Sequence, residues 1–400
     1  MERQTIRVAP QVLDLNEPDQ DPQEALFPTS GETPLRLDNN ESTVAPSPNV
    51  INILKKAVDS ISLNNRADMK ARKLRRQLSQ YSGVAFDSIA CYANQAVMLE
   101  TLARTYLYSG MDALIVGPAD NPLSHYASST GARVINSQFR DPFEPAIEEL
   151  VSGITQQTRM IYISNPNGVS GATLGEAELV FLLSYAQGIM VVVDESYYEY
   201  CGVTVADLID RFPNLIVLRT LSKAFGLAGF DTHYLLTCQE NMKYIGRLSY
   251  GKTPGLLAQV AAGAALDDLY FPADLNRQIN ESKNMLYEGL TRLGYDFRIT
   301  SANFFLLAAA NPGHLVKTLA KQNIFIRDIS HINGFQNYVR ITIGTPSQAG
   351  ILLDILSELS SSQKISLKLV RHGETSLAAQ NDRVKDYADE LVAGTVNSGN

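Results

Sequence analysis

Two stretches between residues 189 and 229 decide how this chain folds: Ile189-Met190-Val191-Val192-Val193-Asp194-Glu195-Ser196-Tyr197 and Leu218-Arg219-Thr220-Leu221-Ser222-Lys223-Ala224-Phe225-Gly226-Leu227-Ala228-Gly229. The first is an apolar run, typical of a buried strand, that ends in an acid. The second begins as an apolar strand, which is followed by Ser222-Lys223 and a glycine-containing turn. In an open α/β sheet, ligands collect beyond the carboxyl ends of the strands. The pairs Asp194-Glu195 and Ser222-Lys223 should therefore face one crevice. A lysine there is a candidate imine-forming nucleophile.

The surrounding chain alternates between short apolar strands and amphipathic helices, which predicts a mostly parallel sheet covered on both faces. Strands are expected at 113–116, 134–135, 160–164, 190–194, 215–218 and 234–237. A long helical stretch over 256–293, interrupted near Phe271-Pro272, leads into strand-like segments at 304–308, 324–327 and 338–343. We therefore predict an α/β fold with an N-terminal arm (1–35), a large domain (50–270), a small α+β domain (36–49 plus 271–360) and a tail (361–400).

The bulk composition narrows the class of protein. Apolar residues make up 45% of the chain and charged residues 19%, as in ordinary globular proteins. The net charge of −8 argues against nucleic acid or an anionic membrane as the main partner. The chain shows no signal peptide, and its cysteines and histidines have no metal-ligand spacing, so we predict a cytoplasmic protein without a metal site.

The tail carries a separate motif, Leu369-Val370-Arg371-His372-Gly373-Glu374-Thr375. It is similar to the phosphohistidine motif of the histidine phosphatases, in which Arg371 and His372 would bind and accept a phosphoryl group. Too little chain follows it to build such a fold. We interpret it as a fusion remnant or a coincidence, and we expect no phosphatase activity.

Residues 36–360 resemble the fold-type I pyridoxal-phosphate aminotransferases, most closely the histidinol-phosphate branch. The resemblance rests on residues 214–229 and on Val339-Arg340-Ile341-Thr342-Ile343-Gly344-Thr345. It implies a role in amino acid metabolism, with Lys223 forming the Schiff base with pyridoxal 5'-phosphate and carrying the proton. It also implies that Asp194 pairs with the pyridine nitrogen, Tyr197 with the phenolic oxygen and Ser222 with the phosphate.

The same resemblance places the substrate. Arg340 would grip the substrate's anionic end, and Arg327 would supply a second cation unless it pairs with Asp328. Asn303 and Asn40 would line the same region. The family's sites straddle two subunits, so a homodimer is expected.

Several positions depart from the family pattern around the cofactor. The family's cofactor-binding asparagine falls on Gly168, and Asn167 could replace it only if the loop shifts by one residue. The phosphate-binding arginine falls on Asp231. The tyrosine that reaches the phosphate from the neighbouring subunit aligns with Arg66.

Other departures affect the ring face, the phosphate loop and the entry segment. The stacking aromatic should lie near Asp120-Asn121, and the nearest substitutes are Tyr92 and Tyr126. The phosphate loop reads Asn94-Gln95-Ala96, which still offers helix N-terminal amides to an anion. Asn40 and Glu41 match the family's entry segment, which closes over the substrate. The substrate-side tyrosine of that segment aligns with Val44.

These departures leave two accounts open. In the first, Arg66 of the other subunit replaces the lost arginine and Asp231 orients it, so the protein is an aminotransferase with altered substrate or chemistry. Decarboxylase, lyase or oxidase chemistry would share the same site. In the second, Arg66 and Asp231 pair, the site has decayed, and the protein is a non-catalytic homologue.

Overall fold

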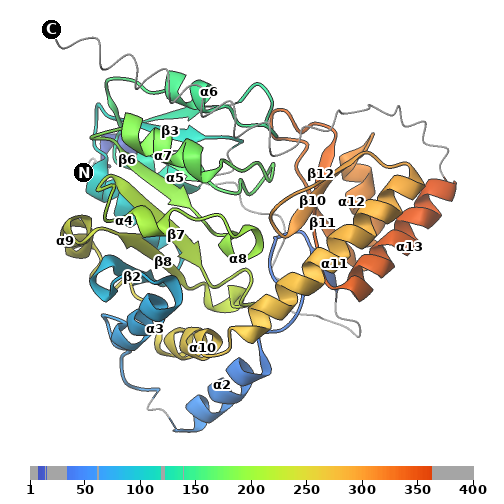
Figure 1. Cartoon of the computed structure of the whole chain (residues 1–400), viewed down its shortest axis with the longest axis horizontal. Helices are drawn as coiled ribbons and strands as arrows, with labels where there is room; N and C mark the ends of the chain where they lie inside the picture. Colours follow the sequence, from blue (N-terminus) through green and yellow to red (C-terminus); the bar gives the residue numbers. More distant parts are fainter. Residues whose placement is uncertain are drawn as a thin grey trace, which may run out of the picture.

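The computed structural model describes residues 8–13, 15, 34–60, 63–118, 122–137 and 139–362, without side chains for the last two. Most of the N-terminal arm and the tail with its Arg371-His372 motif therefore lie outside the described residues. The described chain forms two bodies, each built on its own sheet (Figure 1).

The larger body is organised on a 7-stranded sheet in the order β2-β8-β7-β6-β5-β3-β4. Neighbours from β7 to β4 run parallel, and β8 is antiparallel to both β7 and β2. Consecutive parallel strands put their carboxyl ends at one edge, which is where the site is built. The strands of this 7-stranded sheet are β2 (Ile89–Tyr92), β3 (Asp112–Val116), β4 (Arg133–Ser137), β5 (Thr158–Ser164), β6 (Met190–Asp194), β7 (Leu215–Thr220) and β8 (His233–Thr237).

Helices cover both faces of this sheet because its strands are apolar on both sides. On one face, α4 (Gln95–Tyr106), α5 (Pro122–Ser129) and α9 (Gln239–Leu248) bury Met98, Leu123 and Ile245. The other face is covered by α3 (Arg72–Ser82), α6 (Ile147–Ser152), α7 (Glu176–Tyr185) and α10 (Leu256–Leu266). The short helices α1 (Pro10–Leu13), α8 (Tyr198–Cys201), η1 (Phe86–Ser88), η2 (Ala206–Leu208) and η3 (Ala228–Phe230) complete this body.

The smaller body holds a 5-stranded sheet in the order β1-β11-β12-β10-β9. Helix α11 runs from the end of α10 across to this sheet and packs beside α13 (Figure 1). Helix α2 (Pro48–Ser60) packs on α10. The remaining elements are β1 (Leu35–Leu37), β9 (Phe297–Ile299), β10 (Phe304–Ala308), β11 (Ile324–Asp328), β12 (Tyr338–Thr342), α11 (Tyr270–Leu293), α12 (Pro312–Ala320) and α13 (Pro346–Ser362).

The α/β architecture with a mostly parallel sheet is confirmed, and the predicted strands of both bodies are present. The interruption near Phe271-Pro272 is also real. Helix α10 ends at Leu266, α11 begins at Tyr270, and Pro272 lies in its first turn, where a proline removes no helical hydrogen bond. The edge strands β1, β2 and β9 were not predicted, because segments of three or four residues leave little periodicity. Helix α9 was not predicted either.

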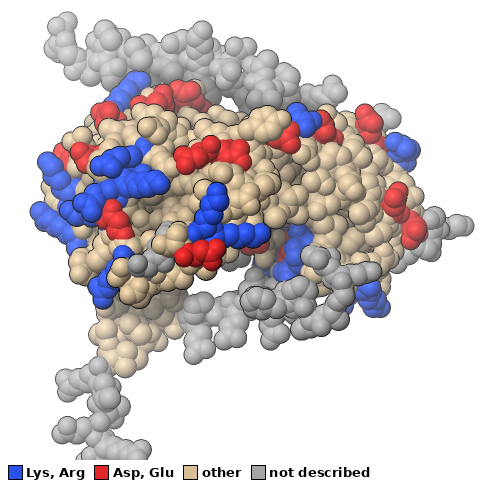
Figure 2. Space-filling model, turned by 90° about the horizontal axis from the view of Figure 1, so that it is seen from below, with Lys and Arg blue, Asp and Glu red and all other residues tan. Residues whose placement is uncertain are grey.

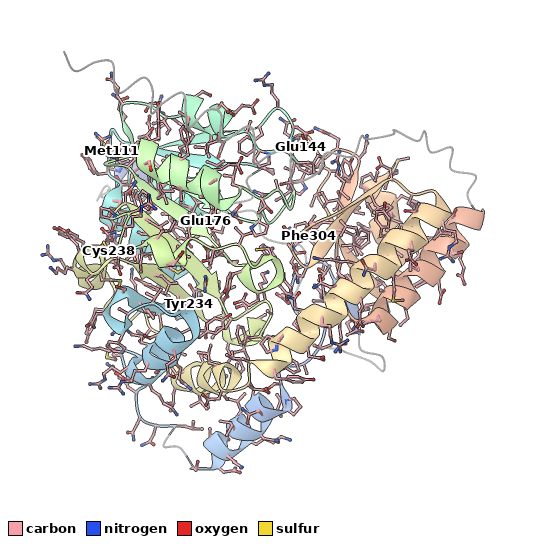
Figure 3. All side chains as sticks on the ribbon, viewed as in Figure 1. Met111, Glu144, Glu176, Tyr234, Cys238 and Phe304 are labelled. Atoms are coloured by element: carbon pink, nitrogen blue, oxygen red, sulfur yellow. The ribbon has the colours of Figure 1, made fainter. Side chains whose placement is uncertain are left out.

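The two bodies meet closely around Gly171 and Phe304. Gly171 has φ +74°, and a Cβ there would overlap the side chain of Thr300, the residue that follows β9. No other residue type fits here without a shift of Thr300. Figure 3 shows Phe304 at this junction, on the strand that follows.

Within the described part of the chain, no helix is long and apolar enough to cross a membrane. On the face in Figure 2, basic and acidic side chains both occur and most of the surface carries neither.

A buried ion pair lies beneath the loop that follows β6. Arg219 (2% exposed) donates from Nε to Oε2 of Glu195 (1% exposed) at 3.0 Å, and from its second amino group to Oγ1 of Thr204 at 2.7 Å. The Tyr198 ring lies 3.7 Å from the guanidinium carbon. This pair fixes the loop that carries Tyr197.

We expect Glu195→Ala to lower the free energy of unfolding by ~3–5 kcal/mol, because it leaves the buried Arg219 without its ion-pair partner. Urea titration followed by circular dichroism measures the change. The exposed Glu240 on α9 is the control, and Glu240→Ala should stay within ~0.5 kcal/mol. A loss below ~1 kcal/mol in Glu195→Ala would contradict this account of the loop.

Candidate functional site

Lys223 lies just beyond the end of β7, next to the end of β6. Asp194 and Leu218 are direct partners in the ladder between these strands, which brings the two polar segments together. The Lys223 ammonium donates to the backbone oxygen of Asn39 at 3.1 Å and lies 5.7 Å from the centroid of the Tyr197 ring. Residues 38–40, which follow β1, thus pass directly over the lysine.

Asp194 is almost fully buried and is held by several donors. Oδ1 accepts from the backbone N–H and the hydroxyl of Ser196 at 3.0 and 2.5 Å. Oδ2 accepts from the Tyr162 hydroxyl at 2.5 Å and from Nε2 of Gln95 at 3.3 Å. The carboxylate therefore faces the site in one fixed orientation.

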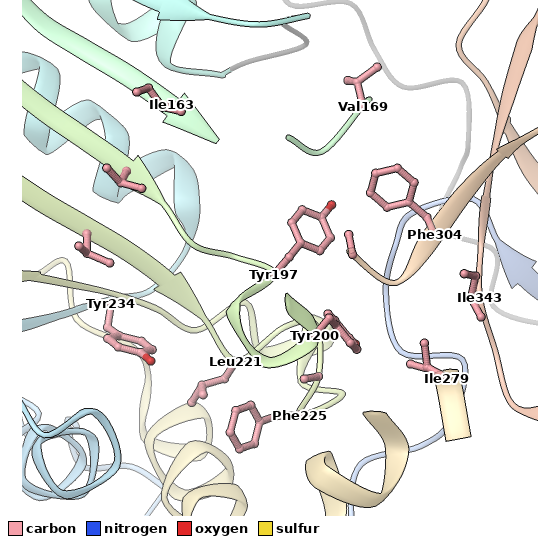
Figure 4. Close-up of a cluster of buried hydrophobic side chains, with 14 of the residues drawn as sticks. Ile163, Val169, Tyr197, Tyr200, Leu221, Phe225, Tyr234, Ile279, Phe304 and Ile343 are labelled. Carbon is pink, nitrogen blue, oxygen red and sulfur yellow. The ribbon is translucent and has the colours of Figure 1, made fainter. Parts of the chain in front are cut away.

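Tyr197 is 5% exposed, and its hydroxyl accepts a hydrogen bond from Nδ2 of Asn40 at 2.9 Å. Its ring packs edge-on against Phe304, and the hydroxyl points toward the space between Phe304 and Val169 (Figure 4). A Cβ on Gly168 would lie 3.4 Å from the same hydroxyl. The Tyr197 hydroxyl therefore receives an amide from Asn40. Gly168, which lies next to the same hydroxyl, has no side chain to offer.

Asn167 is engaged in its own loop. Its Oδ1 accepts from the backbone N–H groups of Val169 and Ser170 at 2.9 and 3.0 Å. Its Nδ2 would lie 2.9 Å from a Cβ on Gly117. The side chain shapes the loop after β5.

The expected phosphate corner lies where β7 ends and α4 begins. Asn94 caps α4 by accepting from the Val97 N–H at 2.8 Å, and Gln95 is the first residue of the helix. Ser222 is 7% exposed, and its Oγ is buried with no hydrogen-bond partner among the described residues. A hydroxyl left in this state fits an anionic ligand that the chain itself does not supply.

Asp231 stands where the family has its phosphate-binding arginine, and it contacts a neighbouring histidine. Asp231, in a left-handed conformation with φ 43°, lies 2.9 Å through Oδ1 from Nε2 of His233. The same ring nitrogen lies 3.3 Å from Oγ1 of Thr220. Arg66 is exposed in the segment between α2 and α3.

The remaining predicted ring contacts are placed as follows. Asp120 and Asn121 lie outside the described residues. Tyr92 is fully buried, with its hydroxyl 2.9 Å from Oγ of Ser249, and Tyr126 makes an edge contact with His125. Val44 packs against the apolar core.

Two arginines of the small sheet face the same entry segment. Arg340 donates to the backbone oxygens of Gly168 at 2.7 Å and Asp38 at 3.0 Å. Arg327, its direct partner in the β11–β12 ladder, donates to Oδ1 of Asn39 at 2.7 Å. Such a pair of guanidiniums suits a carboxylate or phosphate.

Asn303 completes the entry side of the site. It is 1% exposed and donates from Nδ2 to the backbone oxygen of Asn40 at 3.1 Å. The structure thus brings together Lys223, Asp194, Tyr197, Asn40 and Asn303, with both arginines at the entry.

Sequence reasoning missed the residues that support this site from below and beside it. Tyr162 belongs to the apolar run of β5, where nothing distinguishes its hydroxyl from a core tyrosine. Glu199 accepts from the Tyr81 hydroxyl at 3.0 Å, near the buried Arg219. The three acids Asp194, Glu195 and Glu199, directly after an apolar strand, are a signal from which a buried charged network could have been predicted.

The comparisons with known proteins agree with this geometry. The family model described as aminotransferase class I and II matches residues 32–356. The chain belongs to this family. Its members depend on pyridoxal phosphate, and the fold is that of the fold-type I aminotransferases.

Among its aminotransferase relatives, the dihydroxyacetone phosphate transaminase of Campylobacter jejuni is 30% identical over 335 residues, covering 82% of this chain and 91% of that protein. The histidinol-phosphate aminotransferase of Caldanaerobacter subterraneus is 29% identical, covering 82% and 93%. The crystal structure of histidinol-phosphate aminotransferase from Sinorhizobium meliloti, in complex with pyridoxal-5'-phosphate, superimposes with a TM-score of 0.76 at 22% identity, covering 90% and 99%.

The pH dependence of stability should report on Glu199. Burial raises the pKa of Glu199 to about 7, above the value of about 4.3 expected in the unfolded chain. Between these values the folded state holds the proton and the unfolded state does not, so stability falls as pH rises from about 4.3 to about 7. Glu199→Gln should flatten that slope, measured by urea unfolding at several pH values. An unchanged slope in Glu199→Gln would contradict the raised pKa of Glu199.

Proposed function

We propose that this aminotransferase uses Lys223 to bind pyridoxal 5'-phosphate covalently and acts on an amino acid or amino-phosphate with an anionic end. The observation that carries the proposal is the convergence of Lys223, Asp194 and Tyr197 at neighbouring strand ends, beside a buried Ser222 hydroxyl without a partner. These residue types match what the cofactor's aldehyde, ring nitrogen, phenolic oxygen and phosphate require.

When bound, the cofactor supplies an electron sink for charge developing at the substrate's Cα. The residues of the chain supply the rest. Lys223 is the nucleophile and then the proton carrier, because an amine can serve as both in turn. Asp194 keeps the ring nitrogen cationic. Tyr197, whose hydroxyl accepts a hydrogen bond from Asn40, would bind the phenolic oxygen.

At the phosphate end we assign Ser222, together with Asn94 and Gln95 at the N-terminus of α4. The positive charge that the phosphate requires is assigned to Arg66 of a second copy, in a homodimer with shared sites. Its exposed position between α2 and α3 leaves it accessible to a neighbouring subunit. The account with Arg66 also expects Asp231 to orient that arginine; in this structure Oδ1 of Asp231 contacts Nε2 of His233.

Arg340 and Arg327 are assigned to the substrate's anionic end, with Asn303 and Asn40 beside them. Both arginines donate to oxygen atoms of the chain, and oxygen atoms of a substrate would take the same hydrogen bonds. Two relatives carry names that refer to phosphorylated compounds, which supports a phosphate as that anion.

Two alternatives use the same residues. Decarboxylase, lyase or oxidase chemistry would need the same cofactor and differ in which Cα bond is aligned. A non-catalytic homologue is favoured by one observation: Asp231 stands where the phosphate-binding arginine is expected.

We further propose the division into a large domain (50–270) and a small one (36–49 plus 271–360). The cytoplasmic location stays a prediction from the sequence.

Lys223→Ala should abolish the visible absorbance of lysine-bound pyridoxal phosphate, because no other amine is held beside Asp194 and Tyr197 in the described site. Absorbance spectra after incubation with the cofactor, followed by dialysis, measure this. Exposed Lys321→Ala is the control and should retain the band. A wild-type protein without the band would support the non-catalytic reading.

Arg340→Ala should raise KM for an anionic amino substrate about 100-fold, as expected when a charge-assisted, two-pronged contact is lost. The cofactor absorbance should stay unchanged. Arg277, exposed on α11 and paired with Asp274, is the matched control. Steady-state kinetics with amino acids and amino-phosphates would reveal the preferred anion. An equal loss in Arg277→Ala would mean that general surface charge, not the site, is responsible.

A further inference from the structure

The carboxylate of Asp194 makes more hydrogen bonds than the pairing with a ring nitrogen requires. Four donors reach it: two from Ser196 on Oδ1, and Tyr162 and Gln95 on Oδ2. An ionised carboxylate offers about four acceptor positions on its two oxygens. Donors of the chain therefore fill all of them in this structure.

The two donors on Oδ2 differ in strength and in freedom to move. Tyr162 is 3% exposed in the middle of the sheet, on β5 beside β6, and its hydroxyl lies 2.5 Å from Oδ2. Gln95 contacts the same oxygen at 3.3 Å from the first turn of α4 and is only partly buried. A ring nitrogen can displace the Gln95 amide, while the tyrosine stays in place.

A ring nitrogen that pairs with Asp194 then shares Oδ2 with Tyr162. Each donor to a carboxylate stabilises its charge and lowers its basicity, so the oxygen accepts the next hydrogen bond less strongly. The fixed tyrosine thus reduces what Asp194 can contribute to a cationic ring.

We propose that Tyr162 is a positioning residue that acts through Asp194: by holding one acceptor position of Oδ2, it weakens the pairing of Asp194 with the cofactor's ring nitrogen and so limits how firmly that nitrogen is kept protonated. This inference rests on the proposed binding of pyridoxal phosphate. It concerns the strength of the electron sink, which governs how readily charge is accepted from Cα.

The test compares Tyr162→Phe with the wild-type protein, using two ligands. One is pyridoxal phosphate, and the other is its deaza analogue, in which carbon replaces the ring nitrogen. Dissociation constants come from absorbance titration of each apoprotein. We expect Tyr162→Phe to bind pyridoxal phosphate about tenfold more tightly and the analogue with unchanged affinity, because only the first has a nitrogen that gains from the freed oxygen. The spectrum of the bound cofactor at fixed pH should also shift toward the ring-protonated form.

Tyr106→Phe is the matched control. Tyr106 packs against the same apolar cluster, and its buried hydroxyl has no hydrogen-bond partner among the described residues. Loss of that hydroxyl should change neither dissociation constant.

The outcomes separate the two levels of the argument. Equal shifts for both ligands, unchanged affinities, or weaker binding of pyridoxal phosphate in Tyr162→Phe would each overturn the role given to Tyr162 while leaving the proposed function intact. A wild-type protein that binds neither ligand would overturn the proposed function, and the role of Tyr162 with it.

Discussion

The site depends on one short strip of backbone, residues 38–40, which passes between the two sheets. Its carbonyl oxygens accept from Arg340, Lys223 and Asn303, and its side chains reach Arg327 and Tyr197. A buried N–H of the strip bonds to Thr342 at 3.0 Å. Because buried polar groups must be paired, this segment can sit in one place only, and it aligns residues from both sheets around one amine.

The fold was predictable because its signals are local. Apolar runs that end in polar residues locate β6 and β7, and parallel pairing then places Asp194 beside Lys223 without further information. The contact of Asn40 with Tyr197 joins positions far apart in the sequence and had no local signal. Tyr162 could not be separated from core tyrosines, since burial alone does not reveal what a hydroxyl bonds to. The Asp231–His233 pair, two residues apart, is a contact that the sequence could have suggested.

At two positions that depart from the family pattern, the structure shows a nearby polar side chain. Where Gly168 lacks an amide, Asn40 donates to the neighbouring hydroxyl. Where an arginine is expected, Asp231 lies within hydrogen-bond distance of the His233 ring. Changes at one position are thus met by neighbours that already lie within hydrogen-bond reach.

Gly171 has a role that reaches beyond its own contact. A Cβ at this point would overlap the side chain of Thr300, between β9 and β10 of the second sheet, so any residue other than glycine would displace Thr300. That sheet carries Arg327 and Arg340, whereas Lys223 belongs to the first. Close packing at Gly171 therefore helps to set the distance between the Lys223 amine and the two guanidinium groups. An added methyl group at residue 171 would change that distance.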